Sequence, residues 1–384
     1  MRTFAQLPQR GLLIWLLAST FELFLRSMQF VLLVVPGGVA FLRFVLRWSI
    51  SEVGGMRDSF GPLTWWGANL MHWRKLRMTA ASSTLRVDGA PCAFWYDLRH
   101  ADEAPLVPPL LLIYVHGGGF CSHTATEPLF AAPMLERLAA RGVHARVLAL
   151  DYTLAPGEEG RSRQLRQLLH AYNRVASMAH KETKLVLAGD SAGGHLVVAI
   201  VRALLAETPD GHPRTRLPDA LVAISPWAEV ALPQTSRGVH IQHSPSRTRN
   251  SRRGTDYVSL HLLERLALRA GHARDYLLPA KEEEELIPSR DASGAPLLPP
   301  TVIFIGGGEL LVEDGRKLSA TLSLLCPGYP NRVRLVEEPD APHDWPLLPW
   351  FDLRRGTAAR GMDQLAEFVL VSTGLADVPS HQLL

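Results

Sequence analysis

The stretch that most constrains this chain runs from Lys184 to Val198 and reads KLVLAGDSAGGHLVV. A short apolar run rich in strand-forming residues meets a glycine-flanked turn, after which helix-forming residues resume. A strand, a sharp turn and a helix are therefore predicted, with Ser191 at the apex of a G-x-S-x-G pattern. Because such a turn crowds the serine backbone, it needs Gly189 and Gly193 on either side. Taken alone, the pattern is equally typical of a glycine-rich turn whose serine only caps the helix.

Apolar strands and amphipathic helices alternate from Leu110 onward. The strands are expected over 110–115, 145–150, 185–188, 220–225, 301–305 and 332–336. The helices are expected over 128–141, 160–179, 195–207, 315–325 and 356–370. An antiparallel pair of strands, over 84–87 and 93–98, is expected ahead of them. This order predicts an α/β fold with a mostly parallel sheet covered by helices on both faces, in which sites lie at the carboxyl ends of the strands.

Charge and cysteine content exclude several classes of function. The net charge of +3 over 384 residues is too small to indicate a nucleic-acid-binding protein. The three cysteines lie far apart, match no metal-ligand spacing and form no recognisable disulfide framework. The sequence therefore indicates no nucleic-acid partner, no metal and no cofactor, and it says nothing of the oligomeric state.

Apolar residues gather near the N-terminus, in two runs over 11–21 and 28–42. Neither run alone reaches the roughly 18 to 20 residues of a transmembrane helix. Their combined length and the flanking Trp and Arg residues favour a membrane anchor, either single-pass or re-entrant. A cleaved signal peptide and an apolar cap helix on a soluble protein are the alternatives. The expected location is the endoplasmic reticulum membrane, with a soluble cytoplasmic protein as the alternative.

Three parts of the chain are expected. Residues 1–48 form the apolar anchor, residues 49–109 an N-terminal cap with edge strands, and residues 110–384 the α/β domain. Within the last part, residues 231–300 are too many for a loop between a strand and a helix. This segment is interpreted as an insertion with solvated charge runs, in which a helix over about 257–270 acts as a lid over the site.

Glycines follow the strand over 110–115 and can support chemistry at Ser191. This strand runs into HGGGF, where the bare backbone N–H groups of Gly117 and Gly118 can approach a substrate oxygen closely. The N–H group of Ala192, at a helix N-terminus, points to the same place. An activated serine needs such donors, because its attack on a carbonyl develops negative charge on oxygen. Neither of the common phosphate-binding glycine patterns, the rival interpretation, is present.

A base and a carboxylate that could orient it follow the last two strands. His343, in the segment APHDW, comes after the strand over 332–336 and is the candidate base. The strand over 301–305 ends in GGGELLVEDG, so Glu309 emerges directly from the strand-end turn and is the candidate acid. Asp314 is the alternative acid, although it and Glu313 also suit the first turn of the next helix.

Six segments, taken in order, resemble the hormone-sensitive-lipase-like carboxylesterases of the α/β-hydrolase fold, a group that includes arylacetamide and sterol deacetylases. They are HGGGF, DYTLAP, GDSAGG, ISPW, GGGELLVEDG and APHDW, and the resemblance runs from about Leu110 to His343. It implies a catalytic Ser191 as nucleophile and His343 as base. It also implies an oxyanion hole made by the N–H groups of Gly117, Gly118 and Ala192.

The acid motif is where the sequence departs from this family. The family pattern is usually D-x-L-x-D-E with the first carboxylate catalytic, and this chain has Glu309 at that position. Glu313 and Asp314 occupy the two later positions. The resemblance therefore implies a glutamate in the orienting role, and Asp314 remains the alternative.

The predicted function is hydrolysis of a lipophilic small-molecule ester with a short acyl chain, as in a deacetylase. Ser191, His343 and the acid would form the triad, and the N-terminus would hold the protein at a membrane. One alternative keeps the serine chemistry but applies it to a lactone, an amide or an acyl-transfer intermediate. Another is a non-catalytic small-molecule receptor on the same fold, which the presence of His343 argues against.

Overall fold

The computed structural model describes residues 75–90, 92–98, 107–155, 160–206, 215–228, 234–235, 238–239, 256, 258, 297–348 and 356–376. The expected anchor over 1–48, most of the expected cap and most of the insertion over 231–300 lie outside these residues. Among the described residues, no helix has both the length and the hydropathy needed to cross a bilayer.

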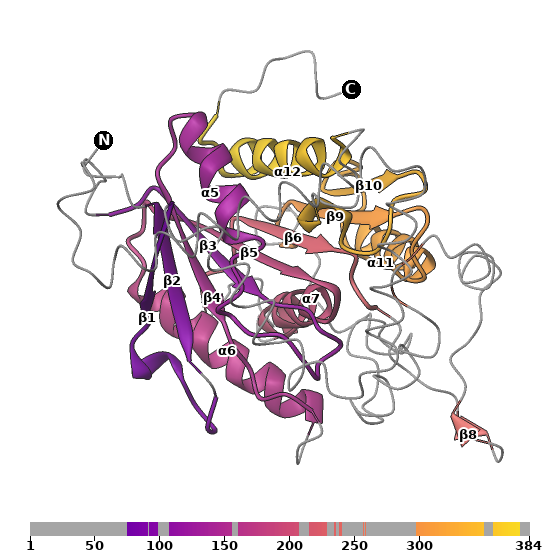
Figure 1. Ribbon diagram of the computed structural model, residues 1–384, viewed down its shortest axis with the longest axis horizontal. Helices are drawn as coiled ribbons and strands as arrows, with labels where there is room; N and C mark the ends of the chain where they lie inside the picture. Colours follow the sequence, from indigo (N-terminus) through magenta and orange to yellow (C-terminus); the bar gives the residue numbers. More distant parts are fainter. Residues whose placement is uncertain are drawn as a thin grey trace, which may run out of the picture.

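An eight-stranded sheet organises the described chain, in the order β1-β2-β4-β3-β5-β6-β9-β10 (Figure 1). Its parallel strands are β3 (Leu110–Val115), β4 (Ala145–Leu150), β5 (Lys184–Asp190), β6 (Ala220–Ile224), β9 (Thr301–Gly306) and β10 (Val333–Glu338). Every residue of β3, β6 and β9 is buried, as expected for parallel strands covered on both faces. The predicted mostly parallel sheet is confirmed.

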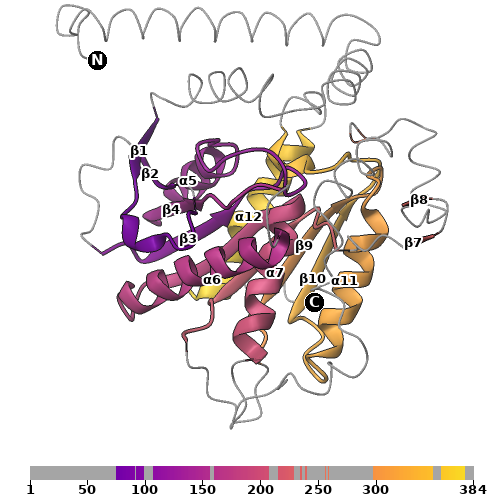
Figure 2. The same ribbon diagram turned by 90° about the horizontal axis from the view of Figure 1, so that it is seen from below.

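Helices cover both faces of this sheet, as Figures 1 and 2 show from two directions. One face carries α6 (Gly160–Met178), α7 (Ser191–Ala206) and α11 (Val312–Leu324), and the other carries α5 (Ala131–Ala140) and α12 (Thr357–Thr373). The side chains of β3 alternate between the two cores: Ile113 packs in the first, and Leu112 and Tyr114 pack in the second. This period of two gives each layer of helices its own apolar core.

The antiparallel edge of the sheet differs from the prediction. The partner of β2 (Ala93–Leu98) is β1 (Leu76–Ala80), whereas the predicted strand over 84–87 is wrong. A short 3-10 helix, η2 (Ser83–Leu85), stands there instead, because the Oγ atom of Ser82 accepts the N–H of Thr84 and turns the chain. The connection between β1 and β2 is thus a capped turn that buries Leu85 under the sheet.

Two short strands, β7 (Gln234–Thr235) and β8 (Gly238–Val239), pair with each other inside the expected insertion. They form a separate two-stranded ribbon rather than an addition to the main sheet. The structure therefore places a hairpin in a segment for which the sequence predicts only a charged insertion and a helix. The range of that predicted helix contains a single described residue, Val258.

Candidate active site

Ser191 lies on a sharp turn between β5 and α7, as the sequence predicts. Its φ of 50° is in the left-handed region, which a residue with a side chain rarely adopts. The flanking glycines allow this turn, because a Cβ atom on Gly193 would lie 2.1 Å from the carbonyl oxygen of Val115. A Cβ atom on Gly189 would lie 2.5 Å from the carbonyl oxygen of Gly193. The turn is therefore packed against the end of β3 too tightly for larger residues.

His343 brings both of its ring nitrogens to predicted partners. Its Nε2 atom lies 2.9 Å from the Oγ atom of Ser191, and its Nδ1 atom lies 3.3 Å from Oε2 of Glu309. The loop after β10 supplies the imidazole, and the turn after β9 supplies the carboxylate. Asp314, the alternative acid, is buried in the first turn of α11, where the sequence also placed it. The arrangement can move a proton from the serine hydroxyl to an imidazole held by a carboxylate.

Buried carboxylates surround this imidazole and set its protonation. Burial lowers the pKa of His343, but the charges of Asp344, Glu309 and Asp256 outweigh burial and raise the pKa to about 10. Burial has the opposite effect on an acid and raises the pKa of Glu309, while the hydrogen bond from His343 opposes that rise. The site therefore gathers several buried carboxyl groups around the imidazole of His343.

The glycine loop after β3 differs from the prediction at its first glycine. The N–H of Gly117 donates a hydrogen bond of 3.0 Å to Oδ1 of Asp190, at the end of β5. The hydroxyl of Tyr114 donates to the same oxygen. The N–H of Gly117, which the sequence predicts as a donor to a substrate oxygen, thus has a buried carboxylate as its acceptor in this structure.

The next two residues of this loop, Gly118 and Gly119, have a left-handed backbone. The φ angles of Gly118 and Gly119 are 92° and 59°, conformations that glycine adopts without strain. Within the described part of the chain, no hydrogen bond in the turns and loops uses the N–H of either glycine or of Ala192. Ala192 lies at the second position of α7, where an N–H group has no partner inside the helix.

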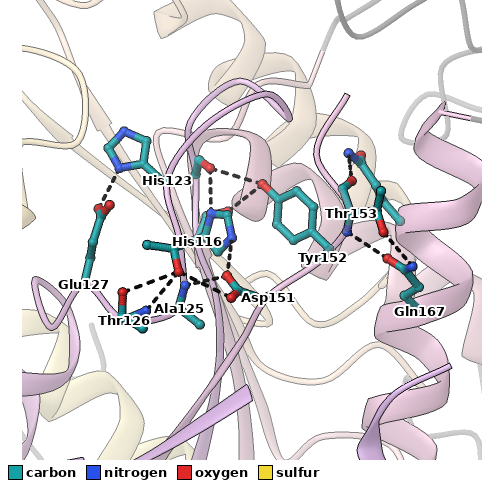
Figure 3. A network of polar contacts seen from close by, with 12 residues as sticks. His116, His123, Ala125, Thr126, Glu127, Asp151, Tyr152, Thr153 and Gln167 are labelled. Carbon is teal, nitrogen blue, oxygen red and sulfur yellow. Dashed lines mark hydrogen bonds and ion pairs between the residues drawn. The ribbon is translucent and has the colours of Figure 1, made fainter. Parts of the chain in front are cut away.

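The segment after β4 holds the glycine loop in place (Figure 3). The hydroxyl of Tyr152 donates to the carbonyl oxygens of His116 and Gly117, at 3.0 and 3.1 Å. The rings of Tyr152 and His116 stack with their centres 4.5 Å apart, and Nε2 of His116 lies 3.2 Å from Oδ1 of Asp151. The motif DYTLAP, which the sequence singled out only by resemblance, thus supports the glycine loop.

Asp256 is a site residue that sequence reasoning missed. Its carboxylate is 2% exposed and accepts three backbone N–H groups, from Val258 at 3.3 Å, Leu310 at 2.9 Å and His343 at 3.2 Å. One side chain from the insertion therefore joins the loop that carries the acid to the loop that carries the base. No motif marks Asp256, which stands among many polar residues of a segment interpreted as solvated surface.

Ser225 and Asp344 also belong to the site and were not predicted. Ser225 follows β6 with a φ of 43°, and its Oγ atom accepts the N–H of Asp344 at 2.9 Å. A side-chain hydrogen bond also joins Ser225 to Glu309 and lowers the pKa of that carboxyl. Oδ2 of Asp344 lies 3.2 Å from Nε2 of His343. The motifs ISPW and APHDW contained the signal for both residues, since Ser225 ends the strand predicted over 220–225 and Asp344 follows the strand predicted over 332–336.

Metal chemistry has no assembled ligand set in the described part of the chain. No group of three His, Cys, Asp or Glu side chains there could hold a metal ion. Cys92, Cys121 and Cys326 form no disulfide bond with one another.

A parallel sheet of this order, with a serine on the turn after β5 and an imidazole delivered to it after the last strand, defines the α/β-hydrolase class. The chain belongs to the alpha/beta hydrolase fold family, whose sequence profile matches residues 112–347. The predicted resemblance to hormone-sensitive-lipase-like α/β-hydrolases is confirmed.

Individual relatives cover most of the chain. This chain is 30% identical over 270 residues to an acetyl-hydrolase of Streptomyces hygroscopicus. The match covers 68% of this chain and 76% of that protein. The chain is 28% identical over 267 residues to the esterase LipU of Mycobacterium tuberculosis, or 68% and 78% of the two chains. A crystal structure of an esterase from the bacterial hormone-sensitive lipase family superposes with a TM-score of 0.62. That match covers 88% of this chain and 99% of the other at 23% identity, and it shows the shared fold.

Proposed function

We propose that this protein is a serine hydrolase of carboxylic esters. The observation that carries the proposal is the 2.9 Å contact between Oγ of Ser191 and Nε2 of His343, whose other nitrogen faces Glu309. The names of two relatives, an acetyl-hydrolase and an esterase, support the same reaction class. An imidazole between a serine and a buried carboxylate is the arrangement that activates a serine hydroxyl.

In the proposed reaction, Oγ of Ser191 attacks the ester carbonyl while its proton passes to Nε2 of His343. The tetrahedral intermediate collapses as the carbon–oxygen bond to the alcohol breaks, and the imidazolium returns the proton to the departing oxygen. Water then attacks the acyl-serine with the same imidazole as base, which releases the acid and restores the serine. Glu309 fixes the orientation of the ring and stabilises its charged form throughout.

The developing oxyanion would be bound by the N–H groups of Gly118, Gly119 and Ala192. Gly118 and Ala192 are the donors named from the sequence, and Gly119 takes the place of Gly117. Gly117 serves a supporting role in this proposal, because its bond to Asp190 fixes the loop against the end of β5. A Cβ atom on Gly117 would lie 2.2 Å from Oδ2 of Asp190, so only glycine permits this approach.

We propose a lipophilic ester with a short acyl chain as the substrate. The acetyl-hydrolase among the relatives supports the short acyl group. Attachment to a membrane through the apolar runs over 11–21 and 28–42, at the endoplasmic reticulum, is part of this proposal, and a soluble cytoplasmic enzyme is its alternative. The proposal also includes three parts of the chain: an anchor over 1–48, a cap over 49–109 and a hydrolase domain over 110–384 that carries the insertion over 231–300.

The test is hydrolysis of 4-nitrophenyl acetate by the full chain and its Ser191→Ala variant. We expect a loss of at least about a thousandfold in kcat/KM, the range found when a catalytic serine is removed. Ser177→Ala, at an exposed serine of α6, is the matched control and should leave the rate unchanged. A fluorophosphonate probe should label the wild type once, at Ser191. No hydrolysis by the wild type, together with failure to label, would leave the receptor interpretation standing. Full activity of the Ser191→Ala variant would contradict Ser191 as the nucleophile.

A further inference from the structure

Asp344 places a second carboxylate at the reacting nitrogen of His343. Asp344 is 8% exposed, and its Oδ2 atom lies 3.2 Å from Nε2 of His343, the nitrogen that also faces Ser191. Glu309 already occupies the orienting position at Nδ1. Asp344 is therefore not a substitute for the acid, because it stands on the opposite side of the imidazole, where chemistry takes place.

The other carboxylate oxygen of Asp344 has no hydrogen-bond partner among the described residues. Oδ1 is fully buried and accepts no hydrogen bond within the described part of the chain. A buried carboxylate oxygen without a donor costs free energy, and each such group in a folded protein calls for an explanation. Burial raises the pKa of Asp344, while the charge of His343 opposes that rise and favours the carboxylate form. The described residues thus supply a buried acceptor without a donor for it.

The backbone at Asp344 is held in a conformation that suits glycine better. Its φ is 52°, and the hydrogen bond from its N–H to Oγ of Ser225 fixes the residue in this geometry. Left-handed backbone at a residue with a side chain is strained and concentrates at functional sites. The carboxylate is therefore kept at Nε2 despite the strain on its backbone, which points to a role for the side chain itself.

The proton transfers made by Nε2 indicate which part of the substrate lies beside Asp344. Nε2 returns its proton to the departing alcohol oxygen, so that oxygen must come within hydrogen-bonding distance of this nitrogen. A group beside Nε2 therefore lies next to the alcohol part of the ester rather than its acyl part. A hydrogen-bond donor on the carbon next to the ester-bearing carbon of the alcohol would fall within reach of the carboxylate.

We propose that Asp344 recognises the alcohol part of the substrate by accepting a hydrogen bond from an O–H or N–H group close to the ester oxygen. The inference rests on the proposed esterase function and narrows its substrate class to esters of diols or amino alcohols. Alcohol parts that carry a negative charge are disfavoured, because Asp190, Asp256, Glu309 and Asp344 are all nine-tenths or more buried around the base.

Such a donor would also help the chemistry. The charge of Asp344 raises the pKa of His343, and the base must be neutral to accept the serine proton. A substrate donor that binds the carboxylate weakens its pull on Nε2. An ammonium group does this by charge as well as by hydrogen bonding, so it should show the larger effect.

The test compares matched ester pairs that differ only in the donor. Propyl acetate and 2-hydroxyethyl acetate are nearly isosteric, as are 3-methylbutyl acetate and 2-(dimethylamino)ethyl acetate in its protonated form. For the wild type we expect kcat/KM to favour the donor-bearing ester of at least one pair by about tenfold to a hundredfold, the range for one hydrogen bond to a charged group. The Asp344→Asn variant should bring that ratio close to one. Because each ratio compares kcat/KM for two esters measured with the same variant, any general effect of the substitution on the base cancels.

Asp340→Asn is the matched control, because Asp340 lies on the same loop with a φ of 56° but is exposed. It should keep the wild-type ratios. Loss of preference for the hydroxyl pair or for the ammonium pair identifies the donor that Asp344 accepts. Unchanged ratios in Asp344→Asn overturn the inference while leaving the esterase proposal intact. Full activity of Ser191→Ala toward propyl acetate would instead remove the esterase proposal. If the asparagine variant does not fold, Asp344→Gly tests the same ratio with the backbone strain removed.

Discussion

At the residue scale, the contact between Glu309 and His343 supports Glu309, rather than Asp314, as the proposed acid of the triad. Oε2 of Glu309 lies 3.3 Å from Nδ1, and the side chain is completely buried. Asp314, the other candidate, lies in the first turn of α11, where a carboxylate interacts favourably with the helix dipole. The two acids therefore have different expected effects when neutralised, one on rate and the other on stability.

Glu309→Gln should lower kcat for 4-nitrophenyl acetate by about a thousandfold to ten-thousandfold, because the amide no longer stabilises the imidazolium and permits the wrong tautomer. Asp314→Asn should change kcat little and should lower the midpoint of urea unfolding. Steady-state kinetics and denaturation of the two variants in parallel provide the measurement. The reverse pattern, with Asp314→Asn inactive and Glu309→Gln active, would transfer the role to Asp314.

At the scale of elements, Asp256 joins two loops that the sheet alone does not connect. Its carboxylate accepts the N–H of Leu310 beside the acid and the N–H of His343 itself. Its charge also raises the pKa of His343. We infer that Asp256 is a positioning residue, which acts on the reaction through the geometry and charge of the base.

Asp256→Asn should lower kcat/KM by roughly tenfold to a hundredfold, since misplacement of a catalytic group by about an ångström has effects of this order. It should also shift the alkaline rise of kcat/KM to lower pH, because one of the charges that favours the imidazolium is removed. The pH–rate profile separates positioning from general destabilisation, which would leave the profile where it is. A profile that stays in place with lower kcat/KM would contradict the electrostatic part of this role.

The elements that the sequence predicted well are those whose patterns are local. The strand over 110–115 has the predicted bounds, because a strand buried on both faces is an unbroken apolar run. The strand predicted over 84–87 failed because Ser82 supplies a cap that turns the chain, and strand propensity does not register such a hydrogen bond.

The candidate site was predicted in part for the same reason. Ser191, Glu309 and His343 each follow a strand and could be placed by that position. The hydrogen-bond partners of Gly117 and those of Asp256 could not be predicted from the sequence. A hydrogen bond from Gly117 to Asp190 depends on β3 and β5 being neighbours, and the contacts of Asp256 depend on how a long insertion returns to the sheet.

For the whole molecule, the strand order explains why the site can form at all. The strands β3, β5, β6, β9 and β10 are consecutive in the sheet, and the loop at the carboxyl end of each contributes to the site. They provide the glycine loop, Ser191, Ser225, Glu309 and His343 in that order. Parallel strands bring all these loops to one edge of the sheet. The same edge also concentrates buried ionisable groups, so the acid–base behaviour of the site is coupled to the stability of the fold.

The sign of this coupling follows from the raised pKa of His343. Between its ordinary value of 6.5 and about 10, the folded protein holds a proton on His343 that the unfolded chain has lost. The stabilisation is therefore fully present below pH 6.5 and is lost as the pH rises through about 10. The raised pKa values of Asp256 and Glu309 act in the same direction at lower pH. Activity should change in the opposite sense, because only the neutral imidazole can accept the serine proton.

We therefore expect kcat/KM for 4-nitrophenyl acetate to rise from pH 6.5 toward pH 10 while the urea midpoint falls over the same interval. One pKa unit corresponds to about 1.4 kcal/mol, so the loss of stability should amount to a few kcal/mol. His343→Gln removes the titrating group and should flatten the stability curve in this range, which separates its contribution from that of exposed groups. An equally steep fall of the midpoint in His343→Gln would show that the proton held by the site does not contribute to the stability of the fold.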